Sequence, residues 1–363
     1  MTQLFNNLKI QGFRGFQEIE LSDLGQVNLI VGTNNSGKTS LLEAISIFCN
    51  PLNPFRWLEV SQRRFLFNRR PIYLRPNIES LKWIFYKQEH LQEEDYRKIL
   101  VQANGNLPIR KLEAEFLEIY GSLQKDKIDD EESENYREGL ELKIKAQETF
   151  YLLNYDGYDV TSEEFQFWED ERFVYKKPHE SFIKNATISP SYSYSEPVGF
   201  TRSILKDKKS KKEILDLIRL FDPYIEDIMI LSPKRQSVLY LGHEKLGLIP
   251  LDVFGDGIKR TLSIVLALQA ATDGVLLIDE IETSIHVSAL TPVFSWLVES
   301  CLEKNVQLFI TTHSLEAVDA MIQSKISQDR IVAFQFNDVN ESIKRFSGDI
   351  LNRLRLKRGL DIR

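Results

Sequence analysis

The segment Gly32-Thr33-Asn34-Asn35-Ser36-Gly37-Lys38-Thr39 fits the pattern G-x-x-x-x-G-K-[ST] and constrains the fold more than any other stretch of the chain. The apolar run Val27–Val31 precedes it, and a helical pattern of apolar residues from Leu41 to Phe48 follows it. A strand, a glycine-rich turn and a helix N-terminus in this order form a cradle of backbone N–H groups for phosphate. The residues expected in this cradle are Gly32, Asn34, Asn35, Ser36, Gly37, Lys38, Thr39 and Ser40.

Two side chains of this loop have specific chemical roles in the prediction. Lys38 is placed to reach the β- and γ-phosphates of a nucleotide, and the Thr39 hydroxyl is placed to hold Mg²⁺. The alternative is an ordinary glycine turn that matches the pattern by chance, and the correct flanks disfavour it. We therefore expect ATP and Mg²⁺ as the ligands, although no segment distinguishes adenine from guanine and GTP stays open.

Two acids follow a buried strand later in the chain. Val275–Ile278 is entirely apolar, and Asp279 and Glu280 come directly after it. Open α/β sheets bind ligands at the carboxyl ends of their strands, so both carboxylates are expected beside the phosphate loop. We predict that Asp279 positions Mg²⁺, usually through water, and that Glu280 polarises the attacking water. The alternative, a solvated acidic turn, is weakened by the phosphate loop.

A third strand ends in a histidine. The apolar run from Leu308 to Ile310 leads through two threonines to His313, which we predict to contact the γ-phosphate. A structural histidine is the alternative. Its place at the end of a strand in the same sheet favours the contact.

A glycine-rich turn opens a helix ahead of the acidic strand. It runs from Phe254 to Arg260, and a helix N-terminus of this kind can bind an anion. The candidate ligand-binding residues in it are Gly255, Asp256, Gly257, Lys259 and Arg260.

Composition excludes several classes of protein. The net charge of −7 argues against a protein that coats nucleic acid, and two cysteines without paired spacing argue against a disulfide framework or a thiolate zinc site. The N-terminus lacks the pattern of a signal peptide, and the longest apolar stretch, Leu262–Ile278, is interrupted by polar residues. We expect a cytoplasmic protein with no membrane segment.

The order of elements predicts an α/β fold with a split parallel sheet. Residues 4–31 are expected to form an antiparallel β-meander, and strands alternate with helices from Glu226 onward, which indicates a parallel sheet. In this interpretation residues 1–50 and 226–363 build one ATPase head around one sheet. Residues 51–225 form a mixed α+β insertion that serves interaction or dimerisation.

The middle of the chain gives weaker signals. Ile78–Val101 is expected to be largely helical, and Glu138–Phe150 alternates as a half-exposed strand. Leu112–Phe116 fits either a strand or a helix. Lys206–Lys212 is strongly basic and is expected to start a helix; it is either a solvated helix start, which charge runs usually are, or a contact for DNA phosphates.

Taken in order, these motifs resemble the ABC-type ATPases of the SMC, RecF and OLD (overcoming lysogenization defect) group. The resemblance to the OLD-like AAA branch lies in three segments, Phe254–Arg260, Ile278–His286 and Thr311–Ser314, and it covers roughly residues 1–50 and 226–340. It implies a head that pairs with a second copy and sandwiches ATP. The loop, both acids and His313 of one subunit would then face Gly255, Asp256 and Gly257 of the other.

The chain departs from the group's pattern in two places. The glycine-rich turn lacks the Ser-Gly-Gly core of transporter-like members, so Lys259 or Arg260 would replace the serine contact to the γ-phosphate. The glutamine that normally follows the first helix cannot be assigned, and Gln62 is only a candidate. Arg14, which by itself is better placed in solvent, matches an arginine of the group's F-R-x-F segment that lies near nucleotide.

The resemblance also bears on function. OLD proteins often continue into a Toprim nuclease domain, and the tail after Phe336 has no room for one. We therefore expect an ATP-gated sensor or scaffold that controls a separate effector in anti-phage defence. Two alternatives stay open: a RecF- or SMC-like repair ATPase that binds DNA directly, and a nuclease in its own right, which the histidine spacing disfavours.

Overall fold

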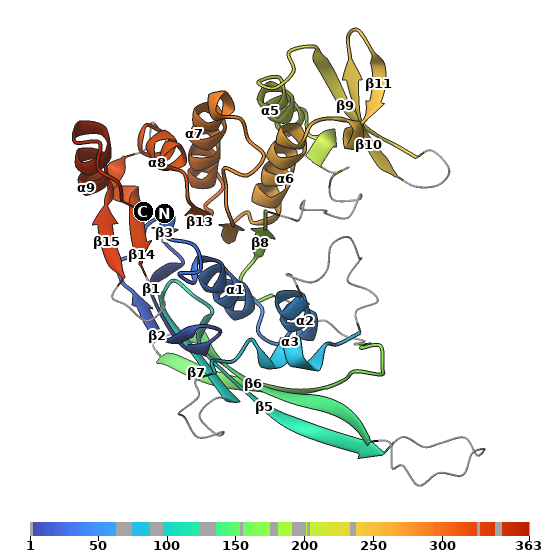
Figure 1. The fold of residues 1–363 in the computed structure, drawn as a ribbon, viewed down its shortest axis with the longest axis vertical. Helices are drawn as coiled ribbons and strands as arrows, with labels where there is room; N and C mark the ends of the chain where they lie inside the picture. Colours follow the sequence, from blue (N-terminus) through green and yellow to red (C-terminus); the bar gives the residue numbers. More distant parts are fainter. Residues whose placement is uncertain are drawn as a thin grey trace.

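The computed structural model describes the chain in eleven ranges, and every structural statement below concerns these ranges. They are 3–62, 75–87, 97–122, 136–152, 155–174, 181–190, 201, 204–232, 237–324, 327–337 and 343–362. Helices α1–α3 lie between a long antiparallel sheet and the elements of a second, mainly parallel sheet (Figure 1). The phosphate loop, Asp279, Glu280 and His313 line one cavity, whereas Gly255, Asp256 and Gly257 lie outside it.

The mainly parallel sheet has the strand order β15-β14-β3-β13-β12-β8. All its neighbouring pairs are parallel except β14 with β15. The strands are β3 (Val27–Gly32), β8 (Asn185–Ile188), β12 (Val275–Ile278), β13 (Gln307–Thr312), β14 (Ile331–Phe336) and β15 (Lys344–Ser347). Strands β3, β12 and β13 are buried throughout, as expected for strands covered on both faces. The predicted strand Val275–Ile278 is confirmed with the same bounds.

Alternate residues of these strands enter two different hydrophobic cores. Ile30 and Phe309 pack toward the antiparallel sheet, whereas Leu29 and Leu308 pack against the helices on the other face. Because successive side chains of a strand point to opposite faces, a run of apolar residues can supply both cores at once. This explains why the strand sequences are continuous apolar runs rather than alternating ones.

The antiparallel sheet has the order β2-β1-β4-β5-β6-β7. Its strands are β1 (Phe5–Phe13), β2 (Phe16–Leu21), β4 (Lys98–Gly105), β5 (Ile109–Ser122), β6 (Tyr136–Leu152) and β7 (Tyr155–Trp168). The expected strand over Glu138–Phe150 is confirmed, and the segment Leu112–Phe116 is part of a strand. The expected helix over Ile78–Val101 is wrong: only α3 (Ile78–Lys82) is helical, and Val101 lies in β4, which buries alternate residues against β1.

The expected meander is confirmed only for its first two strands. β1 and β2 form an antiparallel hairpin, but β3 leaves them and lies between β13 and β14. Strand β4 continues the β1–β2 sheet and β8 adds to the parallel sheet, so the middle of the chain contributes to both sheets. The division into 1–50, 51–225 and 226–363 stays a prediction.

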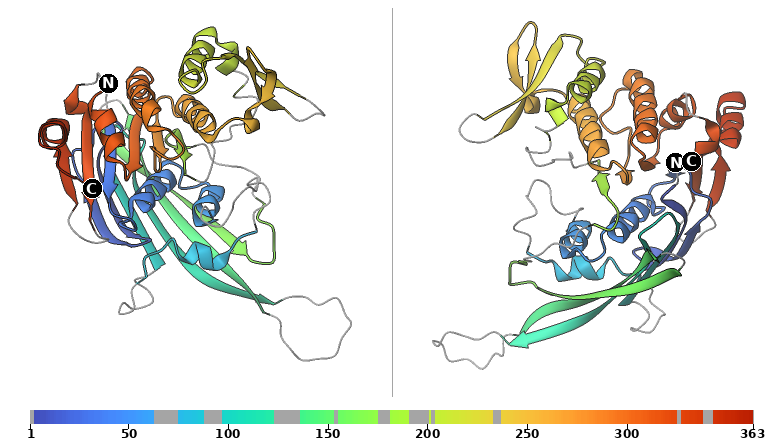
Figure 2. Two further views of the ribbon diagram at one scale, coloured as in Figure 1. Left: turned by 45° about the horizontal axis from the view of Figure 1, so that its top comes forward. Right: turned by 180° about the vertical axis from the view of Figure 1, so that it is seen from behind.

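A third, small sheet has the order β11-β10-β9 and lies at the far end of the molecule from the long strands β5 and β6 (Figure 2). It contains β9 (Ile225–Leu231), β10 (Val238–His243) and β11 (Gly247–Pro250). These strands pair only with one another among the described residues, which corrects the expectation that everything after residue 226 joins one sheet. The reason is a separate core that they build with α5 and α6.

Besides α3, the described α-helices are α1 (Lys38–Cys49), α2 (Pro54–Gln62), α5 (Lys208–Ile218), α6 (Asp256–Ala270), α7 (Val287–Glu303), α8 (Leu315–Ile322) and α9 (Gly348–Asn352). The helices predicted after the phosphate loop, at the basic run Lys206–Lys212 and after the glycine-rich turn are confirmed as α1, α5 and α6, whereas α2 and α9 were not predicted. Side chains of Asp207 and Ser314 cap α5 and α8 by accepting hydrogen bonds from Ser210 N and Ala317 N. Among the described helices, none combines the length and hydropathy that a bilayer span requires.

Candidate nucleotide-binding site

The phosphate loop needs glycine at both ends. Gly32 ends β3 with φ 147°, and a Cβ on it would lie 1.9 Å from the carbonyl oxygen of Phe336. Gly37 precedes α1 with φ 93°, and a Cβ there would lie 2.5 Å from the ring of Phe16. Side chains larger than hydrogen are excluded at both positions by conformation and by contact. The two glycines thus join the strand to the helix in the geometry that the motif predicts.

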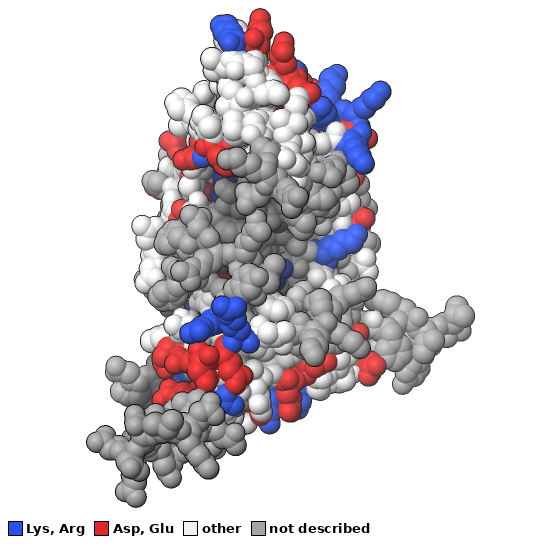
Figure 3. All heavy atoms as spheres, turned by 90° about the vertical axis from the view of Figure 1, so that its right-hand side faces the viewer, with Lys and Arg blue, Asp and Glu red and all other residues white. Residues whose placement is uncertain are grey.

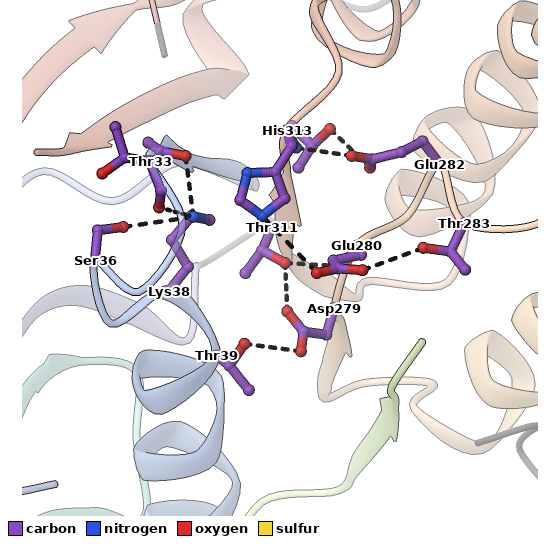
Figure 4. Close-up of polar contacts among 12 residues, drawn as sticks. Thr33, Ser36, Lys38, Thr39, Asp279, Glu280, Glu282, Thr283, Thr311 and His313 are labelled. Atoms are coloured by element: carbon purple, nitrogen blue, oxygen red, sulfur yellow. Dashed lines mark hydrogen bonds and ion pairs between the residues drawn. The ribbon is translucent and has the colours of Figure 1, made fainter. Parts of the chain in front are cut away.

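Lys38 lies inside the curve of the loop, as Figure 4 shows. Its Nζ donates hydrogen bonds to the carbonyl oxygens of Gly32 at 3.0 Å and Thr33 at 2.6 Å, and to Ser36 Oγ at 3.4 Å. The residue is 5% exposed. Burial lowers the pKa of Lys38, while the carboxylates of Asp279, Glu280 and Glu282 oppose that shift. A buried cation is therefore held at the point where the predicted phosphates would lie.

Thr39 and Asp279 meet although they are distant in the sequence. Thr39 Oγ1 donates a hydrogen bond to Asp279 Oδ2 at 2.9 Å, and Thr311 Oγ1 donates to Asp279 Oδ1 at 2.5 Å (Figure 4). A hydroxyl and a carboxylate side by side are hard oxygen donors of the kind that Mg²⁺ uses together with phosphate oxygens. Thr39 and Asp279 thus fit a bound Mg²⁺, which would neutralise charge on the β- and γ-phosphates.

Glu280 and His313 form the next part of the site. His313 Nε2 lies 3.8 Å from Glu280 Oε1, and the Glu280 backbone N–H donates to Thr311 Oγ1 at 2.8 Å. Glu280 has φ 46°, a left-handed conformation that is strained for a residue with a side chain. Such strain persists where the surroundings fix the backbone, and here it turns the carboxylate toward the cavity beside Lys38.

Arg260 stabilises this strained turn through hydrogen bonds to its backbone carbonyl oxygens. Its guanidinium donates hydrogen bonds to the carbonyl oxygens of Ser189 at 2.6 Å, Asp279 at 2.8 Å and Glu280 at 3.2 Å. Arg260 is 5% exposed, and burial lowers its pKa to about 10 against the opposing effect of Asp279 and Glu280. Within one chain the Arg260 side chain bonds to its own backbone, so the predicted contact of Lys259 or Arg260 with the γ-phosphate of a neighbouring subunit stays a prediction.

Glu282 was missed by the sequence reasoning as a site residue. Its Oε1 accepts a hydrogen bond from His313 N at 2.7 Å, and its Oε2 accepts from Thr312 Oγ1 at 2.8 Å. The carboxylate therefore fixes the turn that carries the histidine. Glu282 and Thr311 both lie within motifs that the sequence singles out. Nothing local in the sequence shows that Glu282 bonds to Thr312 and His313, or that Thr311 bonds to Asp279.

The glycine-rich turn lies elsewhere. Gly255 is exposed with open space around it, and Asp256 starts α6 and pairs with Lys259 Nζ at 2.7 Å. Gly257 packs closely, since a Cβ would lie 2.9 Å from the ring of Phe221. Within one chain these residues do not line the cavity of the phosphate loop. Their predicted contact with a nucleotide therefore depends on a second chain and stays a prediction.

A cavity of about 760 Å³ joins the remaining site residues. Its described lining comes from the phosphate loop, the acidic turn, the β1–β2 turn and the α2–α3 region: Arg14, Gly15, Asn34, Asn35, Ser36, Gly37, Lys38, Thr39, Ser40, Ser61, Ser80, Trp83, Lys87, Asp279, Glu280 and His313. The volume falls in the range of small-molecule sites in proteins. The sequence predicted the loop, the two acids and the histidine, but not Ser61, Ser80, Trp83 or Lys87.

Arg14 belongs to the wall of this cavity rather than to solvent. Its Nε forms an ion pair with Glu43 Oε2 of α1 at 2.8 Å, and its guanidinium donates to the carbonyl oxygen of Val60 at 2.9 Å. Gln62 is buried, and its amide donates to the carbonyl oxygen of Arg75 at 2.8 Å. Gln62 is absent from the described lining of the cavity, so the glutamine of the family pattern stays unassigned.

A parallel sheet that presents a phosphate loop, an acidic strand end and a histidine at one edge defines the head of an ABC-type ATPase. A solved structure shares this fold, that of the Smc head domain with an extended coiled coil bound to the C-terminal domain of ScpA, from Pyrococcus furiosus. The match has a TM-score of 0.50 at 10% identity and covers 96% of this chain and 97% of that one. The chain belongs to the family described as "AAA domain, putative AbiEii toxin, Type IV TA system", whose model matches residues 27–319.

Two curated relatives agree with this assignment. An "ATP/GTP phosphatase" of Helicobacter pylori is 24% identical over an alignment of 345 residues, and the match covers 88% of this chain and 88% of that protein. The DNA replication and repair protein RecF of Francisella tularensis is 26% identical over 217 residues, which cover 59% of this chain and 54% of RecF. The chain is thus an ATPase of the AAA, SMC and RecF type at the level of the family.

Proposed function

We propose that this chain binds ATP with Mg²⁺ and hydrolyses it through Glu280 and His313. The observation that carries the proposal is the convergence of Lys38, Thr39, Asp279 and Glu280 on one cavity. The loop amides and Lys38 bind the phosphates, Thr39 and Asp279 hold the metal ion, and Glu280 polarises the attacking water. His313, beside Glu280, contacts the γ-phosphate.

We further propose that two copies close around the nucleotide. Glu280 and His313 are partly exposed at the cavity mouth, and Gly255 and Asp256 are exposed away from it, so a second chain can bring the two surfaces together. The ATP-bound dimer then acts as a sensor or scaffold for a separate effector, such as a Toprim-type nuclease, in an OLD-like defence system in the cytoplasm. The family description, which names a putative toxin of a Type IV system, supports a role in defence.

Glu280→Gln tests the proposal. The amide cannot take up a proton from water, so hydrolysis is expected to fall by about 100-fold or more while ATP stays bound. Light scattering is expected to show a dimer with ATP and a monomer without it. Glu164→Gln, an exposed change on β7, is the control and leaves both properties unchanged. A Glu280→Gln protein that retains ATP but stays monomeric would contradict the dimeric mechanism.

A second candidate is a RecF-like ATPase that binds DNA directly. Lys208, Lys209 and Lys212 are exposed in the first turns of α5, and the similarity to RecF favours this alternative. Among the described residues on the face drawn in Figure 3, however, Lys and Arg side chains lie in separate groups, several of them beside Asp and Glu. Changing the three lysines to alanine should weaken DNA binding and reduce its salt dependence if this function is correct. Absence of DNA binding at low salt excludes it.

A further inference from the structure

We infer that Trp83 is the stacking platform for the purine base of the nucleotide, an inference that rests on the proposed binding of a nucleoside triphosphate. Among Trp, Tyr and Phe residues, Trp83 alone is in the described lining of the cavity that contains Lys38 and Thr39. The phosphate-binding groups account for the charged end of the ligand. The indole supplies the flat apolar surface that the other end requires.

The exposure of Trp83 points to a ligand. Its side chain is 57% exposed, whereas Trp57, which packs under the same region, is fully buried. An exposed indole leaves a large apolar area in water, and stacking a base on it would remove that area from solvent. Trp83 also lies in the wall of a concave site and not on a convex surface, so a small flat molecule can reach the ring.

The backbone fixes the position of the indole relative to the phosphate loop. Trp83 ends α3, where its N–H donates to the carbonyl oxygen of Glu79 at 3.1 Å. The adjoining residues bond to the β1–β2 turn: Arg14 N donates to Ile84 O at 2.7 Å, and Tyr86 N donates to Gly12 O at 2.9 Å. Since Arg14 is paired with α1, the strand end, the loop helix and Trp83 form one connected frame.

Packing beneath the segment adds to this rigidity. Phe85 is buried, and its ring stacks on Trp57 with centroids 6.4 Å apart and an interplanar angle of 15°. A preorganised aromatic surface loses little conformational entropy when a ligand binds, which makes the stacking contact effective.

Lys87 completes the subsite. Its Nζ lies 4.3 Å from the centroid of the Trp83 ring, a cation–π distance, and Lys87 also lines the cavity. The ring and the cation together favour a ligand that is aromatic at one end and anionic at the other. Because every base has a π-face, stacking does not distinguish adenine from guanine. The geometry therefore points to a platform that accepts both purines.

The test compares ligands that do and do not carry a base. ATP, GTP and inorganic tripolyphosphate are titrated calorimetrically with Mg²⁺ into the wild type, Trp83→Ala, Trp83→Phe and Tyr158→Ala. Tyr158 on β7 is 61% exposed and lies outside the cavity lining, so Tyr158→Ala controls for the loss of an exposed aromatic ring. Thermal unfolding of each variant checks that the fold is intact.

We expect Trp83→Ala to weaken ATP and GTP by about 10- to 100-fold and to leave tripolyphosphate unchanged. Trp83→Phe should retain most of the affinity, and Tyr158→Ala all of it. Equal weakening of tripolyphosphate would show a structural role for Trp83 and overturn the inference, as would unchanged affinity for ATP. If wild type binds ATP and tripolyphosphate equally well, the base is not recognised; if it binds neither, the proposed function itself fails.

Discussion

The two large sheets of this molecule both contain many apolar residues, but they differ in how many of their faces are buried and in where their strands end. Strands of the parallel sheet are buried on both faces, and β3, β12 and β13 all end at one edge, where polar groups from distant segments meet. Strands β4–β7 of the antiparallel sheet bury one face and expose the other, and their exposed side chains form cross-strand ion pairs such as Lys143 of β6 with Glu164 of β7 at 3.9 Å.

This difference explains why the functional side chains gather at one edge of the parallel sheet. Parallel strands must all run the same way, so whatever follows each strand is delivered to the same edge. Antiparallel strands deliver alternate turns to opposite ends and leave charges spread over a solvated face. Equivalent substitutions in the two sheets should therefore have very different consequences, and the predictions below compare matched positions.

The largest expected effect is on Lys38. Lys38→Met should lower ATP hydrolysis by about 1,000-fold, because it removes the charge that stabilises the transferred phosphate. The matched change on the antiparallel sheet, Lys143→Met, should leave hydrolysis unchanged, since that lysine lies on a solvated face. Steady-state phosphate release measures both. Hydrolysis that is retained in Lys38→Met, or lost in Lys143→Met, would contradict the prediction that only the lysine of the parallel sheet's edge is needed for it.

The stability of Lys38→Met is expected to change in the opposite direction from its activity. Burial lowers the pKa of Lys38, so the charged form is less favourable in the folded chain than in the unfolded one. Between the pKa of Lys38 in the folded chain and its higher pKa in the unfolded chain, the unfolded chain binds more protons. The charged Lys38 therefore lowers the free energy of unfolding at pH values below both pKa values, and this destabilisation decreases as the pH rises from the lower pKa to the higher one. We expect the melting temperature of Lys38→Met at neutral pH to equal or exceed that of the wild type.

Arg260→Met is expected to have the next largest effect. It removes a donor from the carbonyl oxygens of Ser189 and Asp279 and one of the two donors to that of Glu280, so the free energy of unfolding should fall by about 3 kcal/mol. Arg137 on β6 stacks on Trp168 at 4.1 Å and is partly exposed, so Arg137→Met should cost about 1 kcal/mol or less.

Urea denaturation of Arg260→Met and Arg137→Met measures this difference. If Arg260 holds the strained Glu280, Arg260→Met also loses turnover at saturating ATP with a smaller change in ATP affinity. Similar losses of stability in both variants would show that the acidic turn does not depend on the buried arginine.

A loss of stability of similar size is expected at the phosphate loop glycine. Gly37→Ala places a Cβ against Phe16 at a positive φ, and each of these two penalties is about 1–2 kcal/mol. Gly255 has φ −61° and open space around it, so Gly255→Ala should cost less than about 1 kcal/mol. Thermal unfolding without nucleotide compares the two, and equal losses would show that the loop tolerates a side chain.

The sequence predicted the parallel sheet and its site edge better than the rest of the fold. The apolar runs that end in Asp279 and His313 are local signals, and the rule that parallel strands share an edge places them together without knowledge of contacts. The burial of Arg260 was not predictable. A charged residue next to a glycine-rich turn is expected to be exposed, and only the structure shows the three carbonyl oxygens to which it donates.

The antiparallel sheet shows the limit more clearly. Alternation predicted the strand within Glu138–Phe150, but alternation does not say which strand is its neighbour, and β4 is placed by pairing with β1 far back in the chain. Trp83 depends on the same long-range pairing, since its segment bonds to the turn at Gly12 and Arg14. A site residue positioned in this way carries no local pattern.

The smallest expected effect concerns the two cysteines, which probe one core on each side of the parallel sheet. Cys49 packs toward the antiparallel sheet and Cys301 packs among the helices on the other side. Burial raises the pKa of Cys49 to about 12 and also raises the pKa of Cys301, so the thiolate fraction at pH 8 is very small for both. We expect neither thiol to react with an aromatic disulfide reagent in the native protein, and both to react in guanidinium. Reaction of Cys49 alone under native conditions would show that the layer beneath the antiparallel sheet opens first. The rate of that reaction would then measure how much less free energy this layer needs to open than the layer around Cys301.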